Sequence, residues 1–223
     1  MERYKDDSGH PFLVINVKRR RKTKRMQYML AGLLLIVLMA LGKGENDWSD
    51  AAGAPLDQTL TVHYIDVGQG DATLIMLGEH AMLIDAGPED SGTKLQLYLQ
   101  KQGVKALDYL ILTHPDADHI GGADVIITKF DCGQVMMNGQ TKKTSSYRNV
   151  ESALSYKGYE ALTPVAGSSY SLGEADFTIL GPVQETEDAN NASIAILLKY
   201  GDTRFLFTGD AEKEEEQSIL ETG

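Results

Sequence analysis

The feature that most constrains this chain is an apolar run that ends directly in a cluster of potential metal ligands. Residues 107–112 predict a short buried strand, because a mostly apolar run of this length that ends at a turn signal is typical of one. The segment after it holds His114, Asp116, Asp118 and His119 within six residues, so two of the five histidines of the chain follow one strand. The glycine pair that comes next allows the backbone to turn tightly.

The types and spacing of these side chains predict a metal site. A divalent ion needs several lone-pair donors that converge from one rigid place, and we expect His114 and Asp116 to face one ion while Asp118 and His119 turn to a second. Imidazole suits zinc, iron and manganese, whereas carboxylates favour harder ions such as manganese. The alternative is that one aspartate caps the helix expected from about residue 119. Capping accounts for one aspartate but not for two histidines.

The same run resembles the metal-binding motif of the metallo-β-lactamase fold, His-x-His-x-Asp-His, with Asp116 where the second His usually stands. With Pro115 and the trailing Ile-Gly-Gly, it is similar to the extracellular hydrolase-like domain of the ComEC family of competence proteins. Three other segments also resemble the family. HYIDVGQGDA at 63–72 resembles its opening strand and turn, and MLIDAG at 82–87 resembles its next strand, which ends in a structural Asp. FLFTGD at 205–210 resembles the strand that delivers a bridging Asp.

This resemblance runs from about residue 58 to the end and implies a layered α/β domain, an αββα sandwich. It implies a hydrolase with two divalent metal ions, zinc or manganese. The implied metal ligands are His114, Asp116, Asp118, His119 and Asp210. Asp118 and Asp210 are the implied catalytic residues, with Asp118 orienting the attacking water, and Asp85 is implied as a support of the site. The alternative role for Asp210 is the N-cap of the last helix.

Two departures from the family pattern stand out. The fold normally supplies another His before the bridging Asp, but no His follows His119, and that region reads Asn190-Asn191-Ala192-Ser193, as in the ComEC-like branch. The fold also normally has a final His and closing secondary structure after the bridging Asp, whereas this chain stops one helix after Asp210. We therefore expect the domain at 58–223 to lack its last ligand and its C-terminal closing element.

Charge divides the chain into two parts. Residues 1–43 hold ten Lys or Arg and three Asp or Glu, a net charge of +7. The remainder holds eleven Lys or Arg and twenty-nine Asp or Glu, a net charge of −18. A basic tail at 1–25 precedes an apolar segment at 26–42 and a linker at 43–57. The positive-inside tendency predicts a cytoplasmic tail, a single-pass membrane anchor and an extracytoplasmic domain. A cleavable signal segment is the alternative for an apolar stretch this short, and it predicts a secreted domain. Nucleic-acid binding by the basic run is a further alternative.

The leading interpretation of function is an extracytoplasmic metal-dependent phosphodiesterase or nuclease. The ComEC resemblance makes DNA the first substrate and DNA uptake the process. The −18 charge opposes phosphate binding, and bound metals and a local Lys142-Lys143 patch only partly offset it. One alternative is an anchored phosphodiesterase that acts on cell-surface phosphoesters. The other is a non-catalytic binding module with a degenerate metal site.

Secondary structure follows from the periodicity of the domain. We expect helices at 89–103, 119–129, 147–157 and from Ala211 onward, and strands near 59–66, 71–77, 80–85, 107–112, 161–164, 176–180, 193–200 and 203–208. Turn chemistry accounts for Asp66 and Asp71, which flank a glycine turn. The single cysteine, Cys132, excludes an internal disulfide framework and a Cys-rich zinc site.

Overall fold

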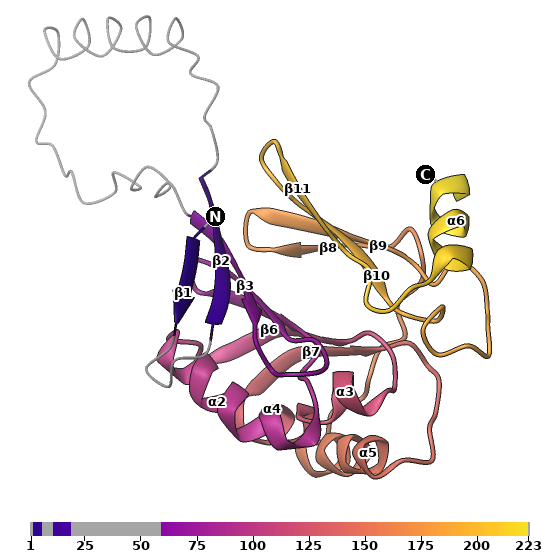
Figure 1. Ribbon diagram of the computed structural model, residues 1–223, viewed down its shortest axis with the longest axis horizontal. Helices are drawn as coiled ribbons and strands as arrows, with labels where there is room; N and C mark the ends of the chain where they lie inside the picture. Colours follow the sequence, from indigo (N-terminus) through magenta and orange to yellow (C-terminus); the bar gives the residue numbers. More distant parts are fainter. Residues whose placement is uncertain (1, 6–10, 19–58, 223) are drawn as a thin grey trace, which may run out of the picture.

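The structure is a computed structural model that describes residues 2–5, 11–18 and 59–222. It contains two β-sheets that pack face to face, with helices on the outer side of the larger one (Figure 1). The larger sheet has the order β1-β2-β3-β4-β5-β6-β7, and the smaller sheet has the order β11-β10-β9-β8. The strands are β1 (Glu2–Lys5), β2 (Pro11–Lys18), β3 (Thr59–Ile65), β4 (Thr73–Leu77), β5 (His80–Ile84), β6 (Ala106–Leu112), β7 (Asp131–Met137), β8 (Ser169–Leu172), β9 (Ala175–Gly181), β10 (Ala195–Tyr200) and β11 (Thr203–Phe207).

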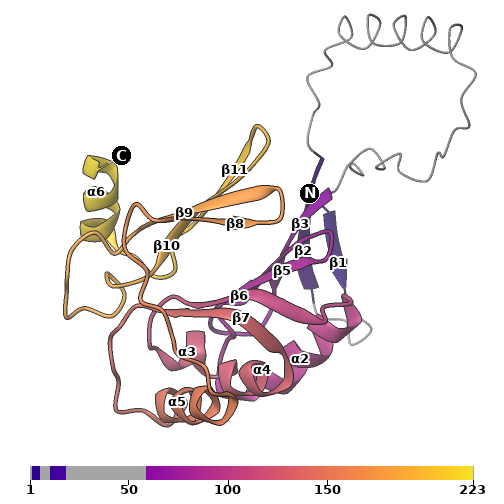
Figure 2. The same cartoon turned by 180° about the vertical axis from the view of Figure 1, so that it is seen from behind.

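The helices that cover the larger sheet follow its parallel strands, because β5, β6 and β7 run in the same direction and need crossover connections. Figure 2 shows this helical layer from behind, on the side of the larger sheet that faces away from the smaller one. The layer contains η1 (Glu89–Ser91), α2 (Gly92–Lys101), α3 (Ala117–Ile120), α4 (Ala123–Lys129) and α5 (Ser145–Lys157). The last helix, α6 (Lys213–Thr222), contacts β9 at one end of the smaller sheet.

Two hydrophobic cores lie on opposite faces of the larger sheet, and β4 shows why. Adjacent side chains of a strand point to opposite faces, so Leu74 enters the core under the helices while Ile75 enters the core between the sheets. Both side chains are fully buried, which explains why β4 is apolar from Leu74 to Leu77 rather than alternating. Phe177 of β9 and Ile196 of β10 close the second core from the smaller sheet. The predicted layered α/β architecture is confirmed.

Several elements differ from their predictions. The helix expected at 119–129 is split into α3 and α4, because Gly121 and Gly122 stand between them. Residues 161–164 form no strand; Leu162 makes only an isolated bridge to Met136. Strands β7 and β8 were not predicted. The apolar residues of β7 are gathered at its end, and β8 is four residues long, so neither shows a clear period.

The N-terminal strands β1 and β2 extend the larger sheet beyond β3. Strand β2 pairs antiparallel with β3 over its whole length, from Lys18 opposite Thr59 to Phe12 opposite Ile65. The predicted anchor at 26–42 and linker at 43–57 lie outside the described residues. No helix within the described residues is long and apolar enough to cross a membrane.

Candidate metal centre

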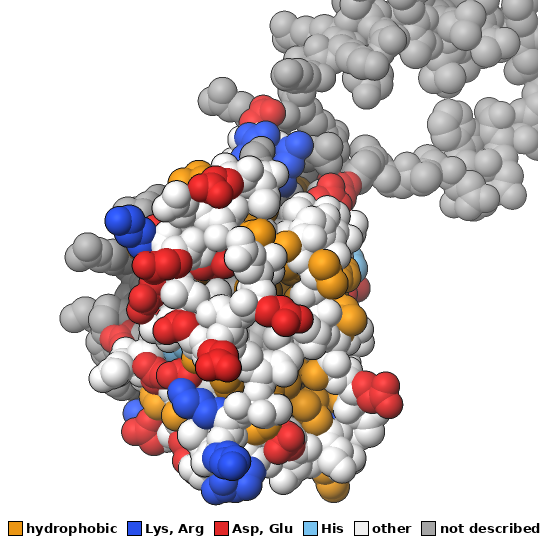
Figure 3. Space-filling model, turned by 90° about the vertical axis from the view of Figure 1, so that its right-hand side faces the viewer, with side chains coloured by type: hydrophobic (Ala, Val, Ile, Leu, Met, Phe, Trp, Pro, Cys, Tyr) orange, Lys and Arg blue, Asp and Glu red, His pale blue; other side chains and the backbone are white. Residues whose placement is uncertain are grey.

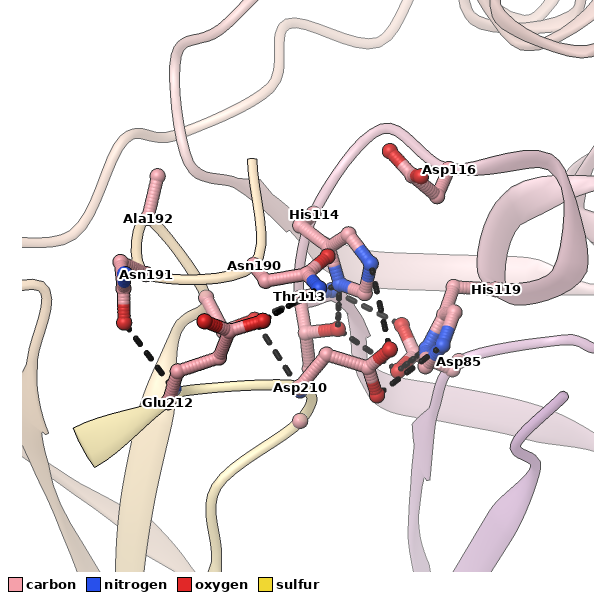
Figure 4. A network of polar contacts seen from close by, with 12 residues as sticks. Asp85, Thr113, His114, Asp116, His119, Asn190, Asn191, Ala192, Asp210 and Glu212 are labelled. Atoms are coloured by element: carbon pink, nitrogen blue, oxygen red, sulfur yellow. Dashed lines mark hydrogen bonds and ion pairs between the residues drawn. The ribbon is translucent and has the colours of Figure 1, made fainter. Parts of the chain in front are cut away.

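Two strand ends, β6 and β11, bring the candidate site together. His114 follows β6, His119 lies on α3 directly after it, and Asp210 follows β11 from the other sheet. The Nε2 atom of His119 lies 3.3 Å from Asp210 Oδ1, and the Nε2 atom of His114 lies 4.0 Å from Asp210 Oδ2 (Figure 4). One ligand atom from each of the three residues lies within 4.8 Å of the other two. Residues that are far apart in sequence therefore present nitrogen and oxygen atoms to one point.

Asp85 orients the histidines from behind. It is buried at the end of β5, and both of its carboxylate oxygens are used. Oδ1 accepts a hydrogen bond from the Thr113 amide at 2.8 Å, and Oδ2 accepts from the Thr113 hydroxyl at 2.7 Å. His119 Nδ1 lies 2.8 Å from Oδ2 and donates its proton there, because a carboxylate only accepts. The other ring nitrogen of His119 therefore faces Asp210.

The same argument assigns the tautomer of His114. Its Nδ1 atom lies 3.1 Å from the Thr113 hydroxyl oxygen, whose only hydrogen is committed to Asp85. The hydroxyl can therefore only accept from the ring, so Nδ1 carries the proton and Nε2 carries a lone pair. That Nε2 atom is buried and has no hydrogen-bond partner. A buried polar atom without a partner is costly, and a metal ion is a natural partner for an imidazole lone pair.

The two histidines have opposite pKa shifts. For His119, burial lowers the pKa, but the hydrogen bond to Asp85 and the charges of Asp85, Asp210 and Asp118 outweigh burial and raise it to about 9. For His114, burial and then the charge of His119 hold the pKa below its ordinary value. In the metal-free protein at neutral pH, His119 is therefore protonated and His114 is neutral.

Ser193 connects the two strand ends that carry the ligands. It is fully buried, its hydroxyl oxygen accepts a hydrogen bond from the Asp210 amide at 3.2 Å, and it lies 3.3 Å from His114 Nδ1. The amides and carbonyls beside it continue the connection, since the Ile194 amide donates to the Thr113 carbonyl at 3.0 Å. Ser193 therefore acts on the position of both ligand-bearing loops.

Asn190 and Asn191 hold the Asp210 loop from its outer side. The side-chain amide of Asn190 donates to Glu212 Oε1 at 3.3 Å, and the Glu212 amide donates to Asn191 Oδ1 at 3.0 Å (Figure 4). The Asn-Asn-Ala-Ser run thus supplies hydrogen bonds between loops. Helix α6 begins at Lys213, so Asp210 lies before the cap position that the alternative interpretation assigned to it.

Glycine residues allow the loops of the site to approach closely. A Cβ atom added to Gly70 would lie 2.0 Å from the Asp118 carbonyl oxygen, and one added to Gly122 would lie 2.5 Å from the Ala86 carbonyl oxygen. Gly121 packs against the Glu89 amide in the same way, at 2.4 Å. The loops after β3, β5 and β6 are therefore pressed against one another beneath His119.

The comparisons with known proteins agree with this geometry. Residues 65–222 match the model of the Metallo-beta-lactamase superfamily. The chain belongs to this superfamily. It is 32% identical over 170 residues to Recombination protein 2 of Haemophilus influenzae and 28% identical over 178 residues to ComE operon protein 3 of Bacillus subtilis. These matches cover 74% and 71% of this chain but 20% and 23% of the relatives, so the chain spans about a quarter or less of their length.

A third relative is Competence protein ComA of Neisseria gonorrhoeae, 25% identical over 83% of this chain and 26% of that protein. Among solved structures, a metallo-beta-lactamase of Cronobacter sakazakii is 16% identical, with a TM-score of 0.46 over 66% of this chain and 58% of that chain. The expected resemblance to ComEC-like members of the metallo-β-lactamase superfamily is confirmed.

The superfamily implies a divalent metal, and the three gathered residues fit one. Two ligands that are each about 2.1 Å from a common ion lie roughly 3–4 Å apart, depending on the angle between them. The Nε2-to-oxygen distances of 3.3 and 4.0 Å are in this range. Three protein ligands that leave other coordination positions open are typical of catalytic rather than structural sites.

Asp116 and Asp118 lie outside this group of three. Asp116 stands at the N-cap position of α3 but makes no cap hydrogen bond, and its carboxylate forms an ion pair with Lys142 instead. Figure 4 shows Asp116 set apart from His119 and Asp210. Asp118 is close enough for its charge to affect the pKa of His119. The structure thus gathers three of the five predicted ligands, and metal binding by all five on two ions stays a prediction.

Sequence reasoning assigned Asp71 to turn chemistry alone, but the structure places it beside the site. Burial raises the pKa of its carboxyl group, His119 lowers it, and Asp85, Asp210 and Asp118 raise it. The Gly68-Gln69-Gly70-Asp71 turn was the sequence signal that could have indicated this position. Gly70 has φ +120°, a conformation that favours glycine, and it lies directly against Asp118. Asp71 adds a further carboxylate to the edge of the centre.

Proposed function

We propose that this chain is a divalent-metal-dependent phosphodiesterase that acts on DNA or a similar phosphodiester during DNA uptake. The observation that carries the proposal is the pair of histidine Nε2 atoms, aimed with Asp210 at one point and oriented from behind by one buried carboxylate. The competence and recombination proteins among the relatives support DNA as the substrate.

Each residue has a task that follows from its position. His114 and His119 would hold the ion from the buried side, and Asp210, whose side chain is 41% exposed, would hold it from the open side. A bound divalent ion would polarise a phosphoryl oxygen and lower the pKa of water. Asp118, at the edge of the site, would accept a proton from the attacking water. The water oxygen adds to phosphorus, the ester P–O bond breaks, and the leaving oxygen takes up a proton.

The acidic charge of the domain is consistent with such a site if binding is local. Acidic side chains are spread over the face shown in Figure 3, and basic ones are few. A phosphodiester is therefore repelled at long range and attracted only where the metal and nearby cations concentrate positive charge. We expect weak binding of long nucleic acids without metal.

The experiment is a manganese and zinc titration of the 223-residue chain, followed by cleavage assays on single-stranded DNA and bis-(p-nitrophenyl) phosphate. We expect the His114→Ala/His119→Ala variant to lose metal binding. We expect Asp210→Asn to lose most activity while its melting temperature stays near that of the wild type, because an amide oxygen is a weaker ligand than a carboxylate. The matched control is Asp202→Asn, an exposed aspartate of the same hairpin. Full activity in Asp210→Asn would contradict the proposal.

A non-catalytic metal-binding module is the second candidate, and the observation that favours it is the small number of gathered ligands. The described residues bring together three ligands, and no histidine follows His119 in the sequence. This candidate predicts metal binding by the wild type without turnover of either substrate.

An extracytoplasmic location is a separate proposal, and the basic run before the apolar segment at 26–42 supports it. A single span at 26–42 would put β2 and β3 on opposite sides of a membrane, whereas strands that pair with each other lie on the same side. A cross-link between these two strands therefore distinguishes the two arrangements.

A further inference from the structure

Lys142 pairs with Asp116, whose charge reaches the buried His114 of the centre. It belongs to the loop between β7 and α5, and its Nζ atom forms an ion pair with Asp116 Oδ1. The Lys142 side chain is 39% exposed and the Asp116 side chain 30%, whereas the His114 and His119 side chains are 0% and 2% exposed. A ligand can therefore reach the Lys142 ammonium group from solvent.

The loop that carries Lys142 is held in place on both sides of it. The Asn138 side chain donates to the Ala192 carbonyl at 3.0 Å, and the Gln140 side chain donates to the Thr186 carbonyl at 2.7 Å. Thr144 caps α5 by accepting from the Tyr147 amide at 3.2 Å. An exposed ion pair by itself contributes about 1 kcal/mol or less. These anchors, rather than the ion pair, place Lys142 beside Asp116.

The metal centre is surrounded by carboxylates, so a cation beside it has a use. Burial raises the pKa of the Asp71 carboxyl group, and the charges of Asp118 and Asp210 both reach this group and raise its pKa further. A phosphate that approaches the centre must pass these carboxylates. The Asp116 side chain does not cap α3, so it is available to hold a cation at this edge. Lys142 is the cation that the fold places there.

We propose that Lys142 positions the phosphate group of the substrate, while Asp116 holds the ammonium group at the mouth of the centre. The inference rests on the proposed function for the identity of the substrate, but not for the binding of an anion. An ammonium group has three N–H donors, so it can keep one on Asp116 and donate another to a non-bridging phosphate oxygen. Lys142 is thus a positioning residue for an anion, separate from the metal ligands.

The test compares Lys142→Met with Lys143→Met in the full chain loaded with manganese. Lys143 is the matched control, because it is the next residue in the same loop and is exposed. Inorganic phosphate is titrated into each protein by calorimetry. We expect about tenfold weaker phosphate binding in Lys142→Met, the loss of one charge-assisted hydrogen bond at a partly exposed site. Lys143→Met should bind phosphate as the wild type does, and Lys142→Arg should restore most of the affinity.

Two further readouts separate phosphate positioning from a purely structural role. Manganese affinity should be unchanged in Lys142→Met, and KM for a phosphodiester should rise while kcat changes little, since ground-state binding is lost. Equal phosphate affinity in the two methionine variants, no phosphate binding by the wild type, or parallel loss of manganese in Lys142→Met would overturn the proposal. Phosphate binding that depends on Lys142 without any turnover would instead refute the phosphodiesterase and leave Lys142 as an anion-binding residue.

Discussion

Replacing Asp85 by Asn tests whether one buried carboxylate orients both histidines. The amide keeps one acceptor oxygen, whereas Asp85 uses both of its oxygens, for the Thr113 amide, the Thr113 hydroxyl and His119. Asn tolerates the left-handed backbone at this position, where φ is +56°, so backbone strain does not confound the test. The variant therefore changes the hydrogen bonding and little else.

The side-chain amide introduced by Asp85→Asn would face two donors. If its oxygen stays on the Thr113 amide, its NH₂ group points at the Thr113 hydroxyl and at His119 Nδ1. His119 then accepts at Nδ1 and carries its proton on Nε2. The Thr113 hydroxyl then turns to donate to His114 Nδ1. His114 must therefore carry its own ring proton on Nε2, as His119 does. In the neutral rings, the Nε2 atoms of both histidines then carry a hydrogen and lose the lone pair that faces Asp210. Asp85 contacts only His119 directly, and its effect on His114 passes through Thr113.

The magnitude follows from the buried contacts that are lost. Removing one partner of a buried, hydrogen-bonded charge costs about 3 kcal/mol of unfolding free energy. Metal affinity falls about 10- to 100-fold, as for other groups that orient a ligating histidine. Chemical denaturation and manganese calorimetry measure the two effects.

Asp108→Asn is the matched control for Asp85→Asn. Asp108 also accepts from a histidine and a backbone amide, His80 and Ala81, both at 2.9 Å, but it lies on the surface far from the centre. We expect its effect to stay within about 1 kcal/mol, because exposed pairs contribute little. Wild-type manganese affinity in Asp85→Asn would refute the argument about tautomers.

Two other predictions concern protons and topology. Because the pKa of His119 is raised from 6.5 to about 9, its protonated form stabilises the metal-free protein fully below pH 6.5, and this stability is lost as the pH rises to about 9. Manganese affinity rises over the same range, because a ligating histidine must be deprotonated. Denaturation of wild type and His119→Asn across this range measures the difference, and a flat difference contradicts it. The pair Asn16→Cys/Thr61→Cys, at facing positions of β2 and β3, should form a disulfide under oxidation in a Cys132→Ala background. Strands on opposite sides of a membrane would give none.

Much of the larger sheet and its helices could be predicted from local patterns. The runs that became β3, β4, β5 and β6 are apolar, bounded by turn residues and five to seven residues long, so their period and length indicate strands. Strand β2 is equally rich in apolar and β-branched residues, but it lies within the segment interpreted as a basic tail. Its partner β3 begins forty-one residues after β2 ends, so no local pattern indicates their pairing. The break at Gly121 was hidden because glycine is also tolerated within helices.

The ligands of the site were easier to predict than the residues that orient them. His114 and His119 are visible because two histidines lie within six residues, and Asp210 was found from the resemblance. Ser193 and Lys142 act through contacts between loops that are distant in sequence, and serine and lysine are common in loops for other reasons. Their roles follow from where the smaller sheet and the β7–α5 loop dock. This information resides in tertiary structure.

The close glycine contacts beneath His119 determine how the centre takes part in the motions of the protein. The Ala86 amide donates to the His119 carbonyl at 2.7 Å, and the Gly122 amide donates to the Gly87 carbonyl at 3.1 Å, both in buried backbone. These bonds cannot open without separating the loops from the core, so their hydrogen exchange should require global rather than local unfolding. Local fluctuations would then be confined to the Asp210 side. A bound ion would exchange with solvent through that side, at a rate set by the motion of one carboxylate.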